Sequence, residues 1–71
     1  MIGERIAASR RKAGLSQQKL AIRLGIHVGT ISYYERGAWP VPPGRLAQIA
    51  EALDDPSLLQ ANDNPETLRA K

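Results

Sequence analysis

The chain has 71 residues, a length that allows one domain with a small hydrophobic core. Hydrophobic residues make up 42% of it and charged residues 24%, which is typical of a folded domain and not of a disordered chain. There is no cysteine and only one histidine, His27, so the composition excludes a disulfide framework, a thiolate metal site and a histidine zinc cluster. We therefore expect no metal and no cofactor.

The charge is distributed unevenly along the chain. Residues 1–45 hold eight Lys and Arg against two Asp and Glu, a net charge of +6, whereas residues 46–71 hold two against five, a net charge of −3. A basic front half favours a polyanionic partner, although chance clustering on a solvated surface is the alternative. No apolar run approaches the roughly 18 residues of a membrane span, and the start does not resemble a signal peptide, so we expect a cytoplasmic protein.

The first predicted helix covers residues 2–13. It places Ile2 and Ile6 on one face, and Gly14 is a suitable stop. Arg10 interrupts this apolar face, where a charged group must either reach water or meet a partner.

Two further short helices follow. The second begins after Ser16, a suitable N-cap, and ends at Gly25. The third runs from about His27 to Arg36 and ends at Gly37. Helices this short are not stable alone, so they must share one core.

The rest of the chain completes an all-α domain. Prolines between Pro40 and Pro43 require an extended connector, a fourth helix follows over residues 44–55, and a short fifth helix opens at Pro56. Residues 1–59 are predicted to form one compact domain of four or five helices. Residues 60–71 are predicted to be a polar, flexible tail.

The second and third helices have the features of a helix-turn-helix. Ala21 is small where the two helices approach, Gly25 suits a tight turn, and Ile31 is apolar where the third helix docks on the second. Such a pair holds the outer face of the third helix away from the body of the domain, so that it can enter a major groove.

With these features the stretch LSQQKLAIRLGIHVGTISYYERG, residues 15–37, resembles the helix-turn-helix of the lambdoid phage repressor and Cro proteins, also called the Xre family. The resemblance covers roughly residues 2–59. The matching residues are Leu15, Ser16, Gln17, Leu20, Ala21, Leu24, Gly25, Ile31, Glu35, Arg36 and Gly37. It implies a lambda repressor-like, five-helix domain that binds specific DNA sequences, usually as a symmetric dimer in transcription regulation.

The resemblance also implies which residues face DNA bases: Val28, Gly29, Ser32 and Tyr33, with core packing as the alternative for Tyr33. Val28 and Gly29 depart from many relatives, which carry hydrogen-bonding side chains there. Readout would then use thymine methyls, close approach at Gly29 and the hydroxyls of Ser32 and Tyr33, or DNA shape. Because glycine is a poor helix former, we also expect Gly29→Ala to stabilise the helix.

The residues that the same resemblance places near phosphates are Gln17, Lys19, His27, Thr30 and Arg36. Gln17 should also brace the recognition helix, and His27 should serve as its N-cap. Trp39 is expected to pack under the proline loop, with donation of its indole N–H to a phosphate as the alternative.

The position of Arg10 acquires an explanation from the resemblance. Family members pair an arginine of the first helix with a glutamate at the end of the recognition helix, and those residues are Arg10 and Glu35 here. Two unrelated surface charges are the alternative interpretation.

The function predicted from the sequence is a transcriptional repressor that binds a palindromic operator as a homodimer and so associates with the nucleoid. Leu58 and Leu59 are adjacent, so at least one should be exposed in the monomer and buried in the dimer.

One alternative function is the DNA-binding antitoxin of a toxin–antitoxin pair. Another is a protein-interaction module that has lost base readout. We do not expect an enzyme, because the sequence lacks a nucleophile–base set.

Overall fold

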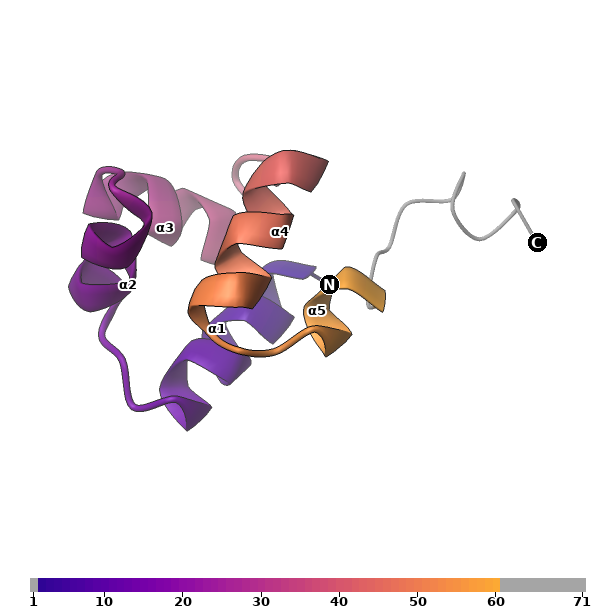
Figure 1. The fold of residues 1–71 in the computed structure, drawn as a ribbon. Coiled ribbons are helices and arrows are strands. Elements are labelled where there is room, and N and C mark those ends of the chain that lie inside the picture. Colours follow the sequence, from indigo (N-terminus) through magenta and orange to yellow (C-terminus); the bar gives the residue numbers. More distant parts are fainter. Residues whose placement is uncertain (1, 61–71) are drawn as a thin grey trace.

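A computed structural model describes residues 2–60, and over this range the protein is entirely helical (Figure 1). The helices are α1 (Ile2–Lys12), α2 (Gln17–Leu24), α3 (Val28–Glu35), α4 (Pro43–Ala52) and α5 (Ser57–Gln60). The predicted all-α class with five helices is confirmed. The predicted tail, residues 60–71, lies outside the described residues except for Gln60, which ends α5.

A single core holds these helices together. Its four most deeply buried large side chains come from four different helices: Ile6, Leu20, Ile31 and Ile49. Burying an aliphatic side chain of this size contributes about 1.5–3 kcal/mol, and no single helix of this length could gain that alone. The helices therefore depend on each other for stability.

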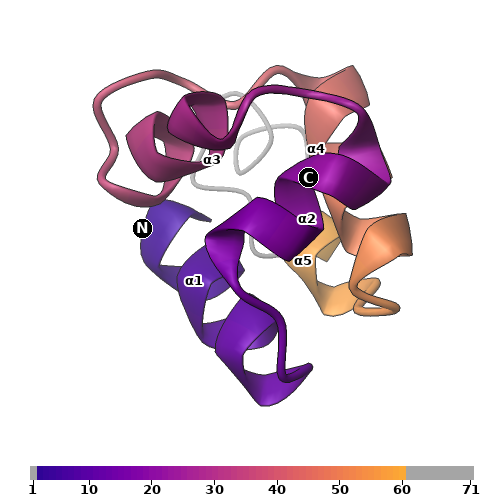
Figure 2. The same ribbon diagram turned by 90° about the vertical axis from the view of Figure 1, so that its left-hand side faces the viewer.

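Helices α2 and α3 lie side by side at one end of the molecule (Figures 1 and 2). Gly25 ends α2 with φ at 70°, a left-handed conformation that is costly for residues with a Cβ atom. The N–H of Ile26 donates to the carbonyl of Ala21 at 3.0 Å, which closes the turn as a Schellman motif. Ala21 and Ile31, which were predicted to lie where α3 docks on α2, are both buried.

Helix α1 crosses the end of α3 unusually closely at Gly3. A Cβ atom at this position would lie 2.4 Å from the carbonyl oxygen of Tyr34 and 2.7 Å from that of Glu35. Both are backbone atoms, so they cannot move aside as a flexible side chain would. The absence of a side chain at Gly3 is therefore a condition for the packing of α1 on α3.

The short helix α5 is joined to α1 through Asp55. The Ser9 hydroxyl donates to Asp55 Oδ2 at 2.7 Å, while the hydroxyl and the N–H of Ser57 donate to Oδ1. The hydrogen bonds from Ser57 and Ser9, in that order, hold the pKa of the Asp55 carboxyl below its ordinary value.

The orientation of α5 corrects one assignment from the sequence. Leu58 is only 2% exposed and belongs to the core, because α5 is oriented so that this side chain points toward the body of the domain. Leu58 is therefore unavailable to a second chain. Leu59, its neighbour, is 48% exposed.

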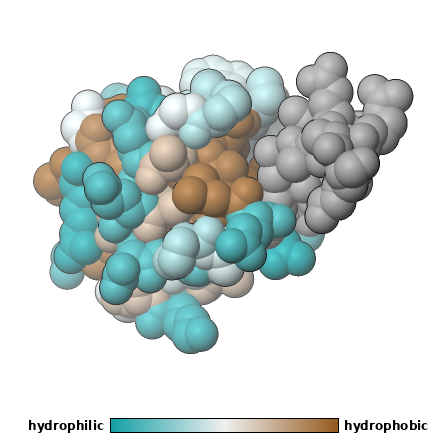
Figure 3. Space-filling view, turned by 45° about the vertical axis from the view of Figure 1, so that its right-hand side comes forward, coloured by the Kyte–Doolittle hydropathy of each residue, from teal (hydrophilic) through white to brown (hydrophobic). Residues whose placement is uncertain are grey.

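The surface of the domain mixes apolar and hydrophilic side chains. On the face shown in Figure 3, hydrophobic atoms reach the surface in patches that hydrophilic residues border. Isolated exposed apolar residues are ordinary in small proteins, which have too little polar surface to cover themselves. Within residues 2–60, none of the helices has the length and hydrophobicity needed to cross a membrane.

The close approach at Gly3 predicts opposite effects for two glycine substitutions in helices. We expect Gly3→Ala to lower the free energy of unfolding by about 1–3 kcal/mol, because the new methyl group must push α1 away from α3. Gly44→Ala should leave stability unchanged or raise it by up to about 1 kcal/mol, since a Cβ atom there meets nothing within 4 Å. Urea denaturation of both variants measures this. A stabilised Gly3→Ala protein would contradict the packing described here.

The lowered pKa of Asp55 predicts a loss of stability in acid. A carboxyl whose pKa is lower in the folded than in the unfolded chain stabilises the fold above the unfolded pKa, and this contribution disappears as the pH falls through the folded pKa. Thermal unfolding of wild type and Asp55→Asn should therefore differ by a constant amount between pH 7 and about pH 5. The difference should shrink below about pH 4. If the difference in stability between wild type and Asp55→Asn does not change with pH, the negative charge of Asp55 does not stabilise the packing of α5 on α1.

Candidate nucleic-acid interface

The start of α3 is fixed by His27. Its Nδ1 atom accepts a hydrogen bond from the N–H of Gly29 at 2.9 Å, so the side chain is the N-cap predicted for it. Since Nδ1 is the acceptor, the proton of the neutral ring lies on Nε2, where it remains available as a donor. The exposed His27 side chain therefore caps the helix with one nitrogen and presents the other outward.

The outward face of α3 contains the side chains that were predicted to meet bases. Val28 and Tyr33 are exposed, and Gly29 and Ser32 are half-buried. Tyr34, in contrast, is buried in the core with Ile31. The helix thus has an inner apolar face and an outer face with few charged groups.

The cap at His27 alters the expectation for Gly29→Ala. A Cβ atom at Gly29 would lie 3.0 Å from His27 Nδ1 and 3.3 Å from Cε1. The imidazole would have to shift by a few tenths of an ångström, which strains the capping hydrogen bond. The gain predicted from helix propensity alone is therefore opposed by a local steric cost that the sequence pattern does not reveal.

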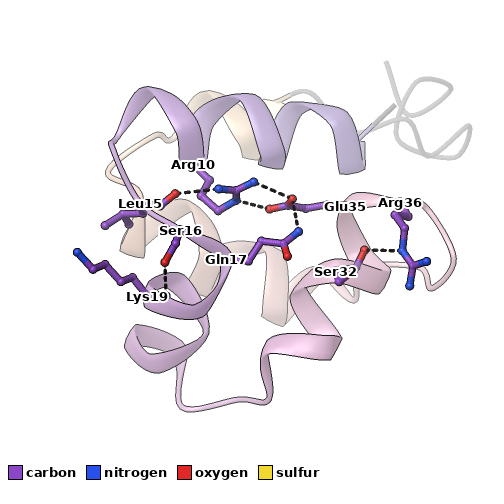
Figure 4. A network of polar contacts seen from close by, with 8 residues as sticks. All are labelled: Arg10, Leu15, Ser16, Gln17, Lys19, Ser32, Glu35 and Arg36. Carbon is purple, nitrogen blue, oxygen red and sulfur yellow. Dashed lines mark hydrogen bonds and ion pairs between the residues drawn. The ribbon is translucent and has the colours of Figure 1, made fainter.

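The C-terminal end of α3 is held by Glu35, which lies at the centre of a buried polar network (Figure 4). Arg10 donates to both carboxylate oxygens, from Nε at 2.6 Å and from Nη2 at 3.1 Å. Gln17 Nε2 donates to Oε1 at 2.9 Å. A further Arg10 nitrogen, Nη1, donates to the Leu15 carbonyl at 2.8 Å. The structure therefore joins the residues predicted to form an ion pair, and it adds Gln17 to them.

The two predicted phosphate-binding cations lie on either side of this network. The Lys19 side chain is exposed on the first turn of α2, and the backbone N–H of Lys19 donates to the capping hydroxyl of Ser16 at 3.1 Å. Arg36 is exposed just beyond α3, and its Nε donates to the Ser32 carbonyl at 3.4 Å (Figure 4). Thr30 is half-buried in the first turn of α3. Both cations therefore reach solvent beside the helix-turn-helix.

An aromatic contact at the end of α3 was not foreseen from the sequence. The rings of Tyr33 and Trp39 have centroids 4.4 Å apart, and the Arg36 guanidinium carbon lies 5.0 Å from the centroid of the Tyr33 ring. Trp39 is 47% exposed, so it rests on Tyr33 and not beneath the proline loop, which corrects our expectation. The two aromatic residues are six positions apart across an irregular loop, and no periodic pattern links them.

Comparison with known proteins identifies similar sequences. The family model described as a helix-turn-helix domain matches residues 2–56. An uncharacterised HTH-type transcriptional regulator of Sinorhizobium medicae is 38% identical over 64 residues, which cover 90% of this chain and 46% of that protein. A protein of the same description from Rhizobium meliloti gives the same values. A third, from Sinorhizobium fredii, is 38% identical over 53 residues, covering 75% of this chain and 37% of its own length.

The chain spans a little under half the length of the first two relatives and a smaller share of the third. No solved structure matches it.

The Glu35 network predicts a large loss of stability when its charge is removed. The Arg10 and Glu35 side chains are only 9% and 6% exposed, so Glu35→Gln leaves a guanidinium buried without its counter-charge. We expect a loss of about 3–5 kcal/mol, which is most of the stability of a domain of this size. Gln17→Ala, which removes one hydrogen bond, should cost about 1 kcal/mol.

Circular dichroism melting curves measure these losses. The double variant Arg10→Met with Glu35→Leu should recover part of the stability, because it replaces both charges with apolar groups of similar length. If Glu35→Gln melts at the wild-type temperature, the network does not hold α3 in place.

Proposed function

Since the chain belongs to the helix-turn-helix domain family, we propose that it is a sequence-specific regulator of transcription that binds double-stranded DNA with α3 in the major groove. The observation that carries this proposal is the outer face of α3. It is exposed at Val28 and Tyr33, while the inner face and the Glu35 network hold the helix rigidly to the domain. Regulation would follow from occupation of DNA and not from catalysis.

Base recognition in this proposal relies on apolar contact and hydroxyl groups. Val28 would contact thymine methyl groups, Gly29 would let the backbone approach the bases closely, and Ser32 and Tyr33 would offer hydrogen bonds. With few side-chain donors at the start of α3, part of the specificity would come from the shape of the DNA.

Phosphate contacts would flank the groove. Lys19 and Arg36 supply positive charge on either side of the Glu35 network, and the Nε2–H of His27 supplies a donor at the N-terminus of α3, where the helix dipole also favours an anion. Gln17 is already hydrogen-bonded to Glu35, so its role would be mainly to orient α3. Thr30 adds a hydroxyl to the first turn of the same helix.

A homodimer on a palindromic site is the assembly that we propose. One short recognition helix contacts only a few base pairs, and two copies must bind half-sites about 34 Å apart to specify an operator. Leu59 is the candidate contact, because it is exposed beside a hollow of about 330 Å³ that Ala47, Ala50 and Pro56 also line. A dimer on an operator would exclude other proteins from that DNA, so repression is the outcome we propose.

Binding to DNA should depend steeply on salt. We expect the logarithm of the association constant to fall linearly with the logarithm of salt concentration, with a slope of about −4 for a dimer in which Lys19 and Arg36 of each protomer neutralise phosphates. Lys19→Ala should reduce this slope by about 2 per dimer and weaken all duplexes alike. Fluorescence anisotropy with labelled duplexes over a range of salt concentrations measures both effects.

Lys12→Ala is the charge-matched control, because Lys12, the last residue of α1, lies near Asp55 and lines a hollow that includes no residue of α3. It should leave the slope unchanged. Absence of binding to any duplex at low salt would exclude DNA as the partner and favour a protein-interaction module.

Dimerisation through Leu59 predicts a selective defect. Leu59→Glu should weaken binding to a full palindrome by at least about tenfold, because a charge replaces an apolar contact, while binding to a single half-site stays the same. Leu59→Met should behave like wild type. Analytical ultracentrifugation with and without the palindrome gives the oligomeric state. Equal affinity of the wild type for half-site and palindrome would contradict the proposed dimer.

A further inference from the structure

Tyr33 and Trp39 form a stacked pair in a region where both are open to solvent. Tyr33 is 38% exposed and Trp39 is 47% exposed, yet their ring centroids are 4.4 Å apart, and the rings are tilted by 37°. Offset and tilted arrangements at this distance are favourable for aromatic pairs. The Arg36 guanidinium carbon, 5.0 Å from the centre of the Tyr33 ring, adds a cation–π contact.

The backbone holds Trp39 in this position independently of its ring. The Tyr33 carbonyl accepts hydrogen bonds from the N–H groups of both Ala38, at 2.9 Å, and Trp39, at 3.4 Å. Gly37 makes this turn with φ at 76°. Pro40 follows directly and restricts Trp39 to extended conformations. Trp39 is therefore tied to residue 33 by main-chain and side-chain contacts at once.

We propose that Trp39, which lies outside the helix-turn-helix, is a positioning residue for base recognition. By stacking on Tyr33 it fixes the direction of the phenol on the outer face of α3, and so determines which bases the Tyr33 hydroxyl can reach. The inference rests on the proposed function, because it requires α3 to lie in the major groove.

The physical basis is preorganisation. A free tyrosine on a helix surface samples several rotamers, and ordering it on DNA costs conformational entropy. In the stack this ordering has already occurred in the free protein. A fixed phenol also discriminates better between bases, since it cannot reorient to suit an incorrect one.

The first experiment asks whether the stack exists in solution without DNA. Trp39 is the only tryptophan of the chain, so tryptophan emission reports on this site alone. Tyr33→Leu should shift the emission to longer wavelength, because Trp39 loses its cover, whereas Tyr33→Phe keeps a ring and should leave the emission unchanged. An identical spectrum for wild type and Tyr33→Leu would overturn the proposal.

The second experiment measures base discrimination. The probes are a duplex that the wild type selects from a random-sequence pool and a scrambled duplex of the same composition. Trp39→Ala should weaken binding to the selected duplex by about fivefold, because the phenol must then be ordered on the DNA, and binding to the scrambled duplex by less than about twofold. Trp39→Phe should restore most of the discrimination, while Trp39→Leu, which is apolar but not aromatic, should not.

A double-mutant cycle and melting curves separate positioning from folding. Tyr33→Leu with Trp39→Ala should bind the selected duplex no more weakly than Tyr33→Leu alone, because the two residues act as one unit. All variants should melt within a few degrees of wild type, since neither ring belongs to the hydrophobic core. Equal weakening of both duplexes by Trp39→Ala, or no weakening, would overturn the inference while DNA binding stands. A wild type that selects no duplex would refute the proposed function and the inference together.

Discussion

The carboxylate of Glu35 is the group on which the arrangement of the first three helices depends. It is the last residue of α3, and it accepts two hydrogen bonds from Arg10 of α1 and one from Gln17 of α2. A carboxylate that is largely removed from water is unfavourable unless its oxygens are paired, so the three helices must meet at this point with the correct geometry. The remaining donor of Arg10 extends the constraint to Leu15, in the connection between α1 and α2.

This network orients α3 in a way that apolar packing could not. Ile31 and Tyr34 attach the inner face of α3 to the core, but hydrophobic contact is non-directional and allows a short helix to rotate or slide. Hydrogen bonds from Arg10 of α1 and Gln17 of α2 remove that freedom at the C-terminal end of α3, whereas the His27 cap only defines where the helix begins. We therefore expect the buried ion pair to contribute to the uniqueness of the arrangement, a role that buried polar groups have in some other proteins.

The features that the sequence predicted are those with a local signal. Ser16 and Gly25 mark helix ends whatever the tertiary fold, and Arg10 is conspicuous because it interrupts an apolar face. Other features depend on distances between segments. Nothing near Gly3 in the chain indicates that two carbonyls of α3 approach it, and the path of the loop after Gly37 decides that Trp39 meets Tyr33. The choice between two adjacent leucines likewise depended on the orientation of α5, which periodicity cannot define in a single turn.

Under the proposed function, the distribution of polar groups on α3 places base recognition at the same end of the helix as the Glu35 network. A recognition helix commonly uses its first residues for base contacts, but Val28 and Gly29 provide no side-chain hydrogen bonds. The hydroxyls of Ser32 and Tyr33 lie in the second half of α3, within three residues of Glu35. A small rotation of the C-terminal end of α3 would therefore move the hydroxyls of Ser32 and Tyr33 directly. The buried carboxylate and the exposed phenol are therefore coupled through one turn of helix.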